Sequence, residues 1–265
     1  MLRGIRWKIT SMRRYRKAGM NMGPGFWIHE LRKAHRQKHF QEYSTKLLDN
    51  ARATGIVIPE AIRPVDLFEI FTDHLYTQFE DFLPSSGDVI IDVGAQYGDY
   101  SILCSAVYGV SQVVAFEPLR NAYEVFQEFI ALNNVKNVVV NNIAIGSYDG
   151  IVQGKDDGHM FGVVMDGFNR TSVPVRTLDS FGFQRIDILK IDVEGFEMEV
   201  LKGAKETISR CRPRIIIETH SSELEQLVMG VLNSGGYAIR HRTSNPSFRM
   251  LGMDRVRNLF FEPSL

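Results

Sequence analysis

The stretch VIIDVGAQYG, Val89–Gly98, decides the fold. Its first five residues are apolar except Asp92 and predict a buried strand, since a short apolar run bounded by turn residues is typical of a parallel sheet. Gly94 and Gly98 allow the chain to turn sharply and to approach a ligand closely before a helix begins. The spacing G-x-x-x-G after an acid differs from the G-x-G-x-x-G of a dinucleotide loop, because Gln96 stands where the second glycine would be.

Two acids stand at the ends of the first two predicted strands. Asp92 would repel a phosphate and attract a cation or an amino group, which favours S-adenosylmethionine, a sulfonium with an ammonium and no phosphate. Glu117 follows the strand Val113–Phe116, where a carboxylate can accept both hydroxyls of a ribose. The alternatives are a tight turn without a ligand and a solvated loop acid. The order strand, acid, glycine turn, helix, strand, acid favours a nucleoside site over these alternatives.

Working outward, short apolar runs alternate with longer periodic runs from Asp88 onward, which predicts βαβ units and a mainly parallel sheet. Further strands are predicted at Val138–Asn142, Ile186–Ile191 and Arg214–Glu218, and helices at Tyr100–Tyr108, Asn121–Leu132, Met198–Ile208 and Glu223–Leu232. The glycine-rich residues 150–178 predict an inserted hairpin or loop region with a strand at Ser172–Arg176. Two closing strands, Tyr237–Arg242 and Asn258–Phe261, are joined by a Ser-Asn-Pro-Ser turn.

The chain divides into a basic, helical N-terminal extension, residues 1–83, and an α/β domain, residues 84–265. Two stretches that can each be helical flank Gly-Pro-Gly at 23–25. Leu67–Phe79 has the spacing of a helix with one apolar face. A length of 265 residues, at about 150 residues per domain, allows one such domain plus the extension.

The formal net charge of zero is a cancellation along the chain. Residues 1–40 contain eleven Lys or Arg and one acid, a net charge of +10, and the other 225 residues carry −10. This gives a second hypothesis, a binding module recruited by its basic arm, with Trp7 and Trp27, to anionic membrane or nucleic acid. The alternative is a solvated helical arm that packs on the acidic remainder or on a second copy, which allows a homo-oligomer.

The sequence predicts a reduced, cytoplasmic protein. Cys104 and Cys211, the only cysteines, lie 107 positions apart in segments expected to be buried, so neither a disulfide framework nor a cysteine metal site is expected. No apolar run follows the N-terminal charges, and no apolar stretch reaches 18 residues. Secretion and a transmembrane anchor are therefore not expected.

At this point the sequence resembles the class I S-adenosylmethionine-dependent methyltransferases, and more narrowly the FkbM family. The narrower resemblance rests on Ile91–Ala95, Phe116–Pro118, Val175–Asp179, Leu189–Gly195 and Val200–Ala204. It covers about residues 85–245. It implies a Rossmann-like, seven-stranded, mainly parallel sheet with a reversed last strand.

The resemblance also implies where S-adenosylmethionine binds and what it methylates. Asp92 and the glycine turn would face the methionine end, Glu117 the ribose, and the turn after the third strand the adenine. The cofactor-binding residues implied are Asp92, Gly94, Ala95, Gly98, Glu117, Pro118, Asn142, Ile143 and Ala144. Family members of known activity mostly methylate hydroxyl groups on sugars or polyketide-type molecules, so an O-methyltransferase with a small-molecule or glycan acceptor is expected.

Candidate catalytic residues follow the fourth and fifth predicted strands, because acceptors bind beyond the carboxyl ends of such strands. Asp192 and Glu194 would point to the same face if the strand persists, as a base or as oxygen ligands of a cation. Glu194 would alternatively cap the next helix. His220 is a candidate general base, because an unperturbed pKa of about 6.5 leaves it neutral at pH 7. We expect Asp192 to orient or deprotonate the acceptor with help from His220, and His159 is a weaker pocket candidate.

Two further expectations concern metals and nucleic acid. No ligand set predicts a structural metal, and a divalent cation is compatible with the acids without being predicted. A nucleic-acid methyltransferase is an alternative, although the predicted sheet lacks an Asn-Pro-Pro-Tyr-type motif and this part of the chain is acidic.

Overall fold

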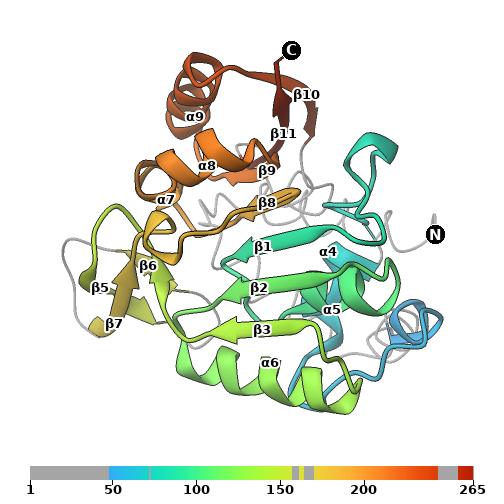
Figure 1. Ribbon diagram of the computed structural model, residues 1–265. Helices are drawn as coiled ribbons and strands as arrows, with labels where there is room; N and C mark the ends of the chain where they lie inside the picture. The colour runs from blue at the N-terminus through green and yellow to red at the C-terminus, as the bar shows by residue number, and fades with distance from the viewer. Residues whose placement is uncertain (1–47, 72, 157–160, 164–169, 244–255, 265) are drawn as a thin grey trace, which may run out of the picture.

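The computed structural model describes residues 48–71, 73–156, 161–163, 170–243 and 256–264 (Figure 1). Four of the expected features lie outside these residues: the helices around Gly-Pro-Gly, the basic arm, His159 and the Ser-Asn-Pro-Ser turn. Within the described part, none of the helices has the length and apolarity needed to cross a bilayer. Cys104 is free and buried, and Cys211 is free and half-buried.

A seven-stranded sheet in the order β10-β11-β9-β8-β1-β2-β3 forms the centre of the molecule (Figure 1). The strands are β1 (Val89–Val93), β2 (Gln112–Phe116), β3 (Val138–Asn141), β8 (Ile188–Ile191), β9 (Arg214–Thr219), β10 (Tyr237–Thr243) and β11 (Arg257–Pro263). From β3 to β9 neighbouring strands are parallel, and β11 runs antiparallel to both β9 and β10. This confirms the mainly parallel sheet with a reversed last strand.

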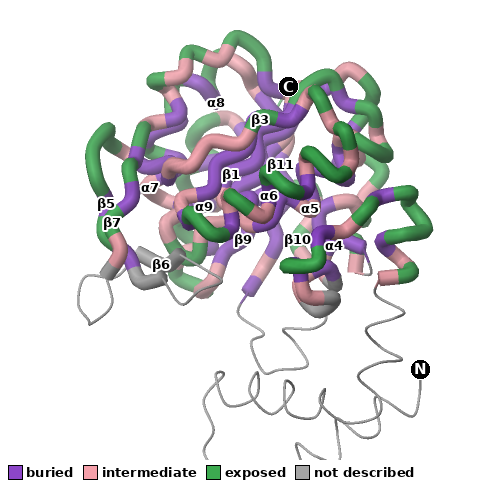
Figure 2. The backbone as a smooth tube through the Cα atoms, turned by 90° about the horizontal axis from the view of Figure 1, so that it is seen from below, coloured by how far each residue is buried: buried purple, intermediate pink, exposed green. Residues whose placement is uncertain are grey.

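Helices cover both faces of this sheet, because successive strand residues point to opposite sides. The helices are α5 (Asp99–Ala106), α6 (Arg120–Leu132), α7 (Glu197–Gly203), α8 (Lys205–Cys211) and α9 (Ser222–Ser234). Ile90 and Ile188 pack with α5 and α6 in one apolar cluster, whereas Ile91 and Leu189 pack with α7, α8 and α9 in the other. The central strands are accordingly buried along their length (Figure 2).

The predicted helix Met198–Ile208 is two helices, α7 and α8, which meet at Ala204. The carboxylate of Asp179 accepts hydrogen bonds from the N–H groups of Glu206 and Thr207, at 3.1 and 2.7 Å. An acid at the first turn of a helix satisfies N–H groups that have no partner within the helix. Asp179 lies in a short 3-10 helix, η3 (Asp179–Phe181), so this contact fixes where α8 starts.

The predicted helix Leu67–Phe79 is wrong beyond Phe71. The chain forms η1 (Pro64–Leu67) and α4 (Phe68–Phe71), then turns through His74, whose φ of 51° is left-handed, and forms η2 (Glu80–Phe82). The apolar spacing arises instead because these residues are buried in the cluster that contains α5 and α6. Residues 51–82 therefore share a core with the central sheet.

The inserted hairpin expected between residues 150 and 178 is confirmed as part of a second sheet. Its strands are β4 (Ala144–Ile145), β5 (Gly150–Asp156), β6 (Phe161–Val163) and β7 (Arg170–Arg176), in the order β4-β7-β5-β6. β5 pairs antiparallel with both β6 and β7, and β4 pairs parallel with β7. The small sheet lies beside the carboxyl ends of the central parallel strands (Figure 1).

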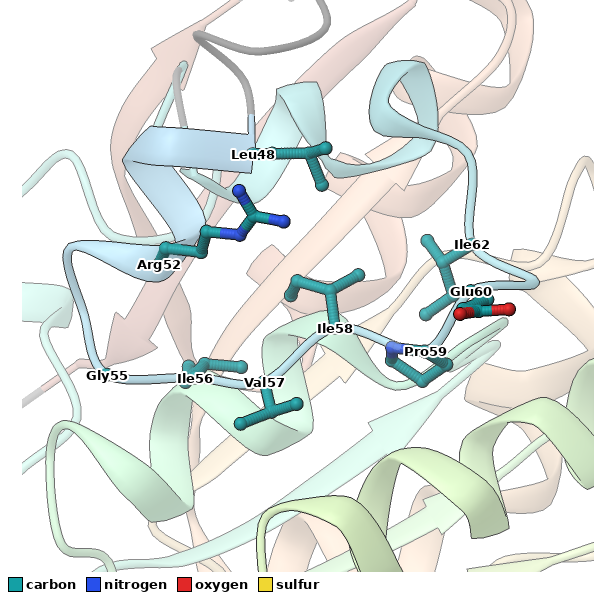
Figure 3. A pocket seen from close by; sticks show the side chains of 9 residues that line it. All are labelled: Leu48, Arg52, Gly55, Ile56, Val57, Ile58, Pro59, Glu60 and Ile62. Atoms are coloured by element: carbon teal, nitrogen blue, oxygen red, sulfur yellow. The ribbon is translucent and has the colours of Figure 1, made fainter.

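A cavity of about 530 Å³ lies among residues that precede the central sheet (Figure 3). It is lined by Leu48, Arg52, Ile62 and residues 55–60. Val57 exchanges two hydrogen bonds of 2.8 Å with the side chain of Asn133, which follows α6 and precedes β3. The cavity is therefore at the edge of the sheet where the strands begin, away from the edge where the predicted site residues gather.

Candidate active site

The two glycine positions in the turn between β1 and α5 have no room for a side chain. Gly94 and Gly98 have φ values of 76° and 82°, which L-residues rarely adopt. A Cβ atom at Gly94 would lie 1.7 Å from the carbonyl oxygen of Asp192, and one at Gly98 would lie 2.0 Å from the ring of Phe126. The turn is held against β2, because the N–H groups of Gly94 and Ala95 both donate to the carbonyl oxygen of Phe116. The glycines thus bring the end of β1 against the end of β8.

Glu117 lies next to this turn and is nearly buried, with 5% of the residue exposed. Its Oε2 accepts a hydrogen bond from the Gln96 N–H and its Oε1 from the Leu119 N–H, both at 2.8 Å. Burial raises the pKa of Glu117 to about 7, although the two backbone hydrogen bonds act in the opposite direction. An ionised carboxylate has about four acceptor positions, so two remain for hydroxyl donors.

The residues expected at the adenine lie beside Glu117, in the turn between β3 and β4. The Asn142 side-chain amide donates to the carbonyl oxygens of Glu117 and Pro118, at 2.9 and 3.0 Å. Ile143 is half-buried, and Ala144 is buried at the start of β4. This turn is therefore tied to the turn after β2, and its cofactor role stays a prediction.

Asp92 is fully buried behind the glycine turn. Ser101 donates to its Oδ2 at 2.7 Å, and the Lys190 ammonium lies 3.2 Å from its Oδ1. Lys190 also donates to the carbonyl oxygen of Gly94 at 2.8 Å. Burial by itself would lower the pKa of Lys190, but the charges of Asp92 and Asp192 raise it above its ordinary value. Asp92 thus holds Lys190 beneath the turn, and its expected contact with the methionine end stays a prediction.

A ring of carboxylates surrounds His220 just beyond β8 and β9. His220 Nε2 lies 3.4 Å from Glu194 Oε2, 3.4 Å from Glu218 Oε1 and 3.9 Å from Asp192 Oδ1. On the other side of the ring, Nδ1 lies 3.0 Å from Glu197 Oε1. The structure therefore brings together all three predicted catalytic residues and adds two acids, Glu197 and Glu218.

The surroundings of His220 favour its protonated form, and its expected role as a general base stays a prediction. Burial would lower its pKa, but the contacts with Glu197 and Glu218 and the charges of Asp192 and Glu194 raise the pKa to about 12. With these acids alone around it, the imidazole carries two protons. Its ring nitrogens are then donors and neither accepts a proton from an acceptor hydroxyl.

Glu194 reaches the ring by a route that differs from the predicted one. β8 ends at Ile191, so the same-face argument for a continuing strand does not apply. Glu194 has a left-handed φ of 52°, and this turn directs its carboxylate to His220. Burial raises the pKa of Glu194 to about 7, against the effect of His220. The alternative role of Glu194 as a helix cap is not seen, because Phe196 is the N-cap of α7 and no side chain makes a cap hydrogen bond there. Glu197 accepts a hydrogen bond from the N–H of Gly195 at 3.0 Å.

Tyr76 comes to this site from the segment that precedes β1. Its hydroxyl donates to Asp192 Oδ2 at 2.9 Å, and its ring centroid lies 5.2 Å from the Lys190 ammonium. Sequence reasoning missed Tyr76, Glu197 and Lys190. Only Lys190 carried a signal, since a lysine in the buried strand Ile188–Ile191 needs a charged partner.

Residues 92–241 match the family described as the methyltransferase FkbM domain, and this is more than half of the chain. The chain belongs to the FkbM methyltransferase family. Methyltransferase 1 of Beauveria bassiana (strain ARSEF 2860) is 25% identical over 223 residues, covering 72% of this chain and 88% of that protein. Methyltransferase sdnD of Sordaria araneosa is 27% identical over 215 residues, covering 64% and 80%. A methyltransferase FkbM structure from Methylobacillus flagellatus KT has a TM-score of 0.49 and 17% identity, covering 81% of this chain and 59% of that one.

Membership identifies this protein as an S-adenosylmethionine-dependent methyltransferase, and the residues present fit that cofactor. The glycine turn lets the backbone approach a ligand closely, and the nearly buried Glu117 has acceptor positions left for hydroxyls. Tyr76 lies outside the matched residues, so the segment before the family domain supplies one contact of the site.

Proposed function

We propose that this FkbM methyltransferase transfers the methyl group of S-adenosylmethionine to a hydroxyl group of a sugar or other small molecule. The observation that carries the proposal is the contact between the two halves of the site. The main chain of Asp192 lies directly against Gly94, and its side chain belongs to the carboxylate ring. A reacting methyl at the glycine turn and an acceptor beside Asp192 would therefore be neighbours.

Different residues of this chain would bind different parts of S-adenosylmethionine. Glu117 would accept the ribose hydroxyls, and the Gly94–Gly98 turn would lie against the methionine end. When bound, S-adenosylmethionine supplies a methyl carbon on a positively charged sulfur, and that sulfur keeps the electron pair of the broken carbon–sulfur bond. Alignment of the acceptor oxygen behind the methyl carbon, at about 3 Å, supplies much of the rate in such a displacement.

Asp192 would orient the acceptor hydroxyl and take its proton as the new oxygen–carbon bond forms. Tyr76 and Lys190 hold this carboxylate, by a hydrogen bond of 2.9 Å and an ion pair of 3.9 Å. The proton leaves the hydroxyl oxygen for the carboxylate, and the electron pair of the O–H bond remains on oxygen to attack. His220, 3.9 Å from Asp192, would help to position this carboxylate.

The test separates cofactor binding from methyl transfer. S-adenosylhomocysteine binding is measured by calorimetry, and transfer to a panel of hydroxylated small molecules is measured by mass spectrometry, with the new bond identified as an ether by NMR. We expect Asp192→Asn to reduce transfer at least tenfold while S-adenosylhomocysteine affinity changes less than twofold. Unchanged transfer by this variant would exclude the role of Asp192. Methylation at nitrogen or carbon would exclude O-methylation.

A further inference from the structure

The carboxylate ring brings four acidic side chains to a single imidazole, that of His220. Asp192, Glu194, Glu197 and Glu218 all have an oxygen within 3.9 Å of a ring nitrogen of His220. Glu197 is fully buried and Glu218 is 3% exposed. The neighbouring Lys190 is closer to Asp92 than to Asp192, with distances of 3.2 and 3.9 Å. Buried carboxylates are costly unless a cation pairs with them. A further positive charge would therefore stabilise this ring.

The contact that His220 makes through Nδ1 is one that metal-binding histidines commonly make. Its Nδ1 contacts Glu197 Oε1 at 3.0 Å, and its Nε2 faces the other carboxylates. A histidine that binds a metal through one nitrogen usually donates its other N–H to a carboxylate or a carbonyl, which fixes the tautomer. Glu197 performs that task here from a fully buried position in the first turn of α7.

Three side chains present one ligand atom each at suitable separations. The ligand atoms of Asp192, Glu218 and His220 all lie within 4.8 Å of one another. Nε2 is 3.4 Å from Glu218 and 3.9 Å from Asp192. Two atoms that are each about 2.1 Å from one ion are about 3.0 Å apart at a right angle and about 4.2 Å apart in line, so both distances fit.

Glu218 adds an independent indication. It is 3% exposed, its Oε1 faces His220, and its Oε2 has no hydrogen-bond partner among the described residues. A buried polar atom without a partner is rare in folded proteins and often marks an ion or water position. The nearly buried carboxylate therefore faces His220 through Oε1, while its Oε2 makes no hydrogen bond among the described residues.

We propose that Asp192, Glu218 and His220 bind a divalent cation, with Glu197 as a positioning residue for His220. The mixed set of one imidazole nitrogen and carboxylate oxygens suits a small divalent ion such as Mn²⁺. The ion takes the position of the Nε2 proton of His220, and that proton is released to solvent. The proposal concerns ion binding and stands whether or not O-methylation is correct.

The test uses the full chain without cofactor or acceptor. Mn²⁺ is titrated, and the free aqueous ion is followed by electron paramagnetic resonance. We expect one bound Mn²⁺ per chain, and at least tenfold weaker binding for Asp192→Asn and for Glu218→Gln. Glu128→Gln, an exposed substitution on α6 and far from the ring, should bind as the unaltered protein does. Equal binding by both ring variants, or no binding of Mn²⁺, Mg²⁺ or Zn²⁺ by the unaltered protein, would overturn the proposal.

A second measurement uses the unaltered protein, so its result does not depend on whether the variants fold. Bound Mn²⁺ should broaden the ring NMR signals of His220 more strongly than those of His241. His241 is a suitable comparison because it contacts a single carboxylate, that of Asp81, at 2.8 Å. Broadening of His241 without His220 would contradict the assignment. Failure of S-adenosylhomocysteine to bind would instead count against the cofactor site and leave this result unchanged.

Discussion

At the scale of single residues, Glu117 has the charge state that most directly controls a binding step. Its burial raises the pKa to about 7 from an ordinary value of 4.5. A ribose hydroxyl donates more strongly to an ionised carboxylate than to a neutral carboxyl group. Cofactor binding therefore favours the ionised form, and the full affinity is present only above the raised pKa.

We predict that the affinity for S-adenosylhomocysteine falls as the pH is lowered from 8 to 6, because Glu117 takes up a proton through this range. Glu117→Gln should bind at least tenfold more weakly at pH 8 and lose most of this pH dependence. Calorimetry at pH 6, 7 and 8 measures both effects. Glu128→Gln is the control, and an unchanged pH dependence in Glu117→Gln would exclude Glu117 as its source.

Gly98 is a left-handed glycine in a crowded position, whereas Gly109 is a left-handed glycine with open space around it. Gly98→Ala should lower the free energy of unfolding by about 2–5 kcal/mol, because the new Cβ adds overpacking against Phe126 to an unfavourable φ. Gly109→Ala, at a φ of 64° with no atom within 4 Å, should cost only about 1–2 kcal/mol. Urea denaturation of both variants without cofactor gives the comparison. Equal losses would show that backbone conformation alone requires Gly98.

At the scale of elements, α7 joins the two sheets. Gly203, at its C-terminal end, lies so close to the turn after β4 that an added Cβ would be 1.8 Å from the carbonyl oxygen of Gly146. The N-terminal turn of the same helix carries Glu197 against His220. A shift of α7 would therefore disturb both the junction with the small sheet and the carboxylate ring.

Two helical glycines test this junction. We predict that Gly203→Ala lowers the free energy of unfolding by about 1–3 kcal/mol, since the backbone must move apart. Gly230→Ala, in the exposed middle of α9 with no atom within 4 Å, should raise it by about 0.5–1 kcal/mol, because alanine is the better helix former. Thermal and urea unfolding report both values. Stabilisation by Gly203→Ala would contradict the close contact.

Helices and strands were predictable from the sequence where the pattern of apolar residues had a single structural explanation. The apolar runs of β1 and β8 predict buried strands, because only a strand covered on both faces carries such a run. The stretch Leu67–Phe79 misled because a buried, irregular segment produced a helical spacing of apolar residues. The left-handed turn at His74 has no sequence signal comparable with that of a glycine.

The site was predictable to the same degree. Asp192, Glu194 and His220 follow strands whose carboxyl ends meet, so their grouping follows from topology. The charge of His220 does not follow from topology, because it depends on Glu197. Glu197 is an acid in the first turn of a helix, and the sequence does not show whether such an acid is buried or exposed. Tyr76 was equally hidden, since its partner Asp192 is 116 positions away.

At the scale of the whole molecule, charge divides the chain into two unlike parts. Residues 1–40 carry a net charge of +10, and the remaining 225 residues carry −10. An acidic body is repelled by an anionic surface, so any attraction to such a surface has to come from the arm. Each basic residue near an anionic bilayer contributes about 1 kcal/mol, and the effect falls as salt screens it.

We predict that the full chain binds vesicles containing phosphatidylserine at low salt and is released at high salt, whereas a chain lacking residues 1–40 does not bind. Trp7 and Trp27 favour a lipid surface, because aromatic side chains suit the membrane–water interface. Vesicle sedimentation at several salt concentrations measures this, with uncharged vesicles as the control. S-adenosylhomocysteine binding shows whether the shortened chain is folded. Binding to nucleic acid but not to vesicles would assign the arm to that partner, and binding to neither would favour packing on the acidic body or on a second copy.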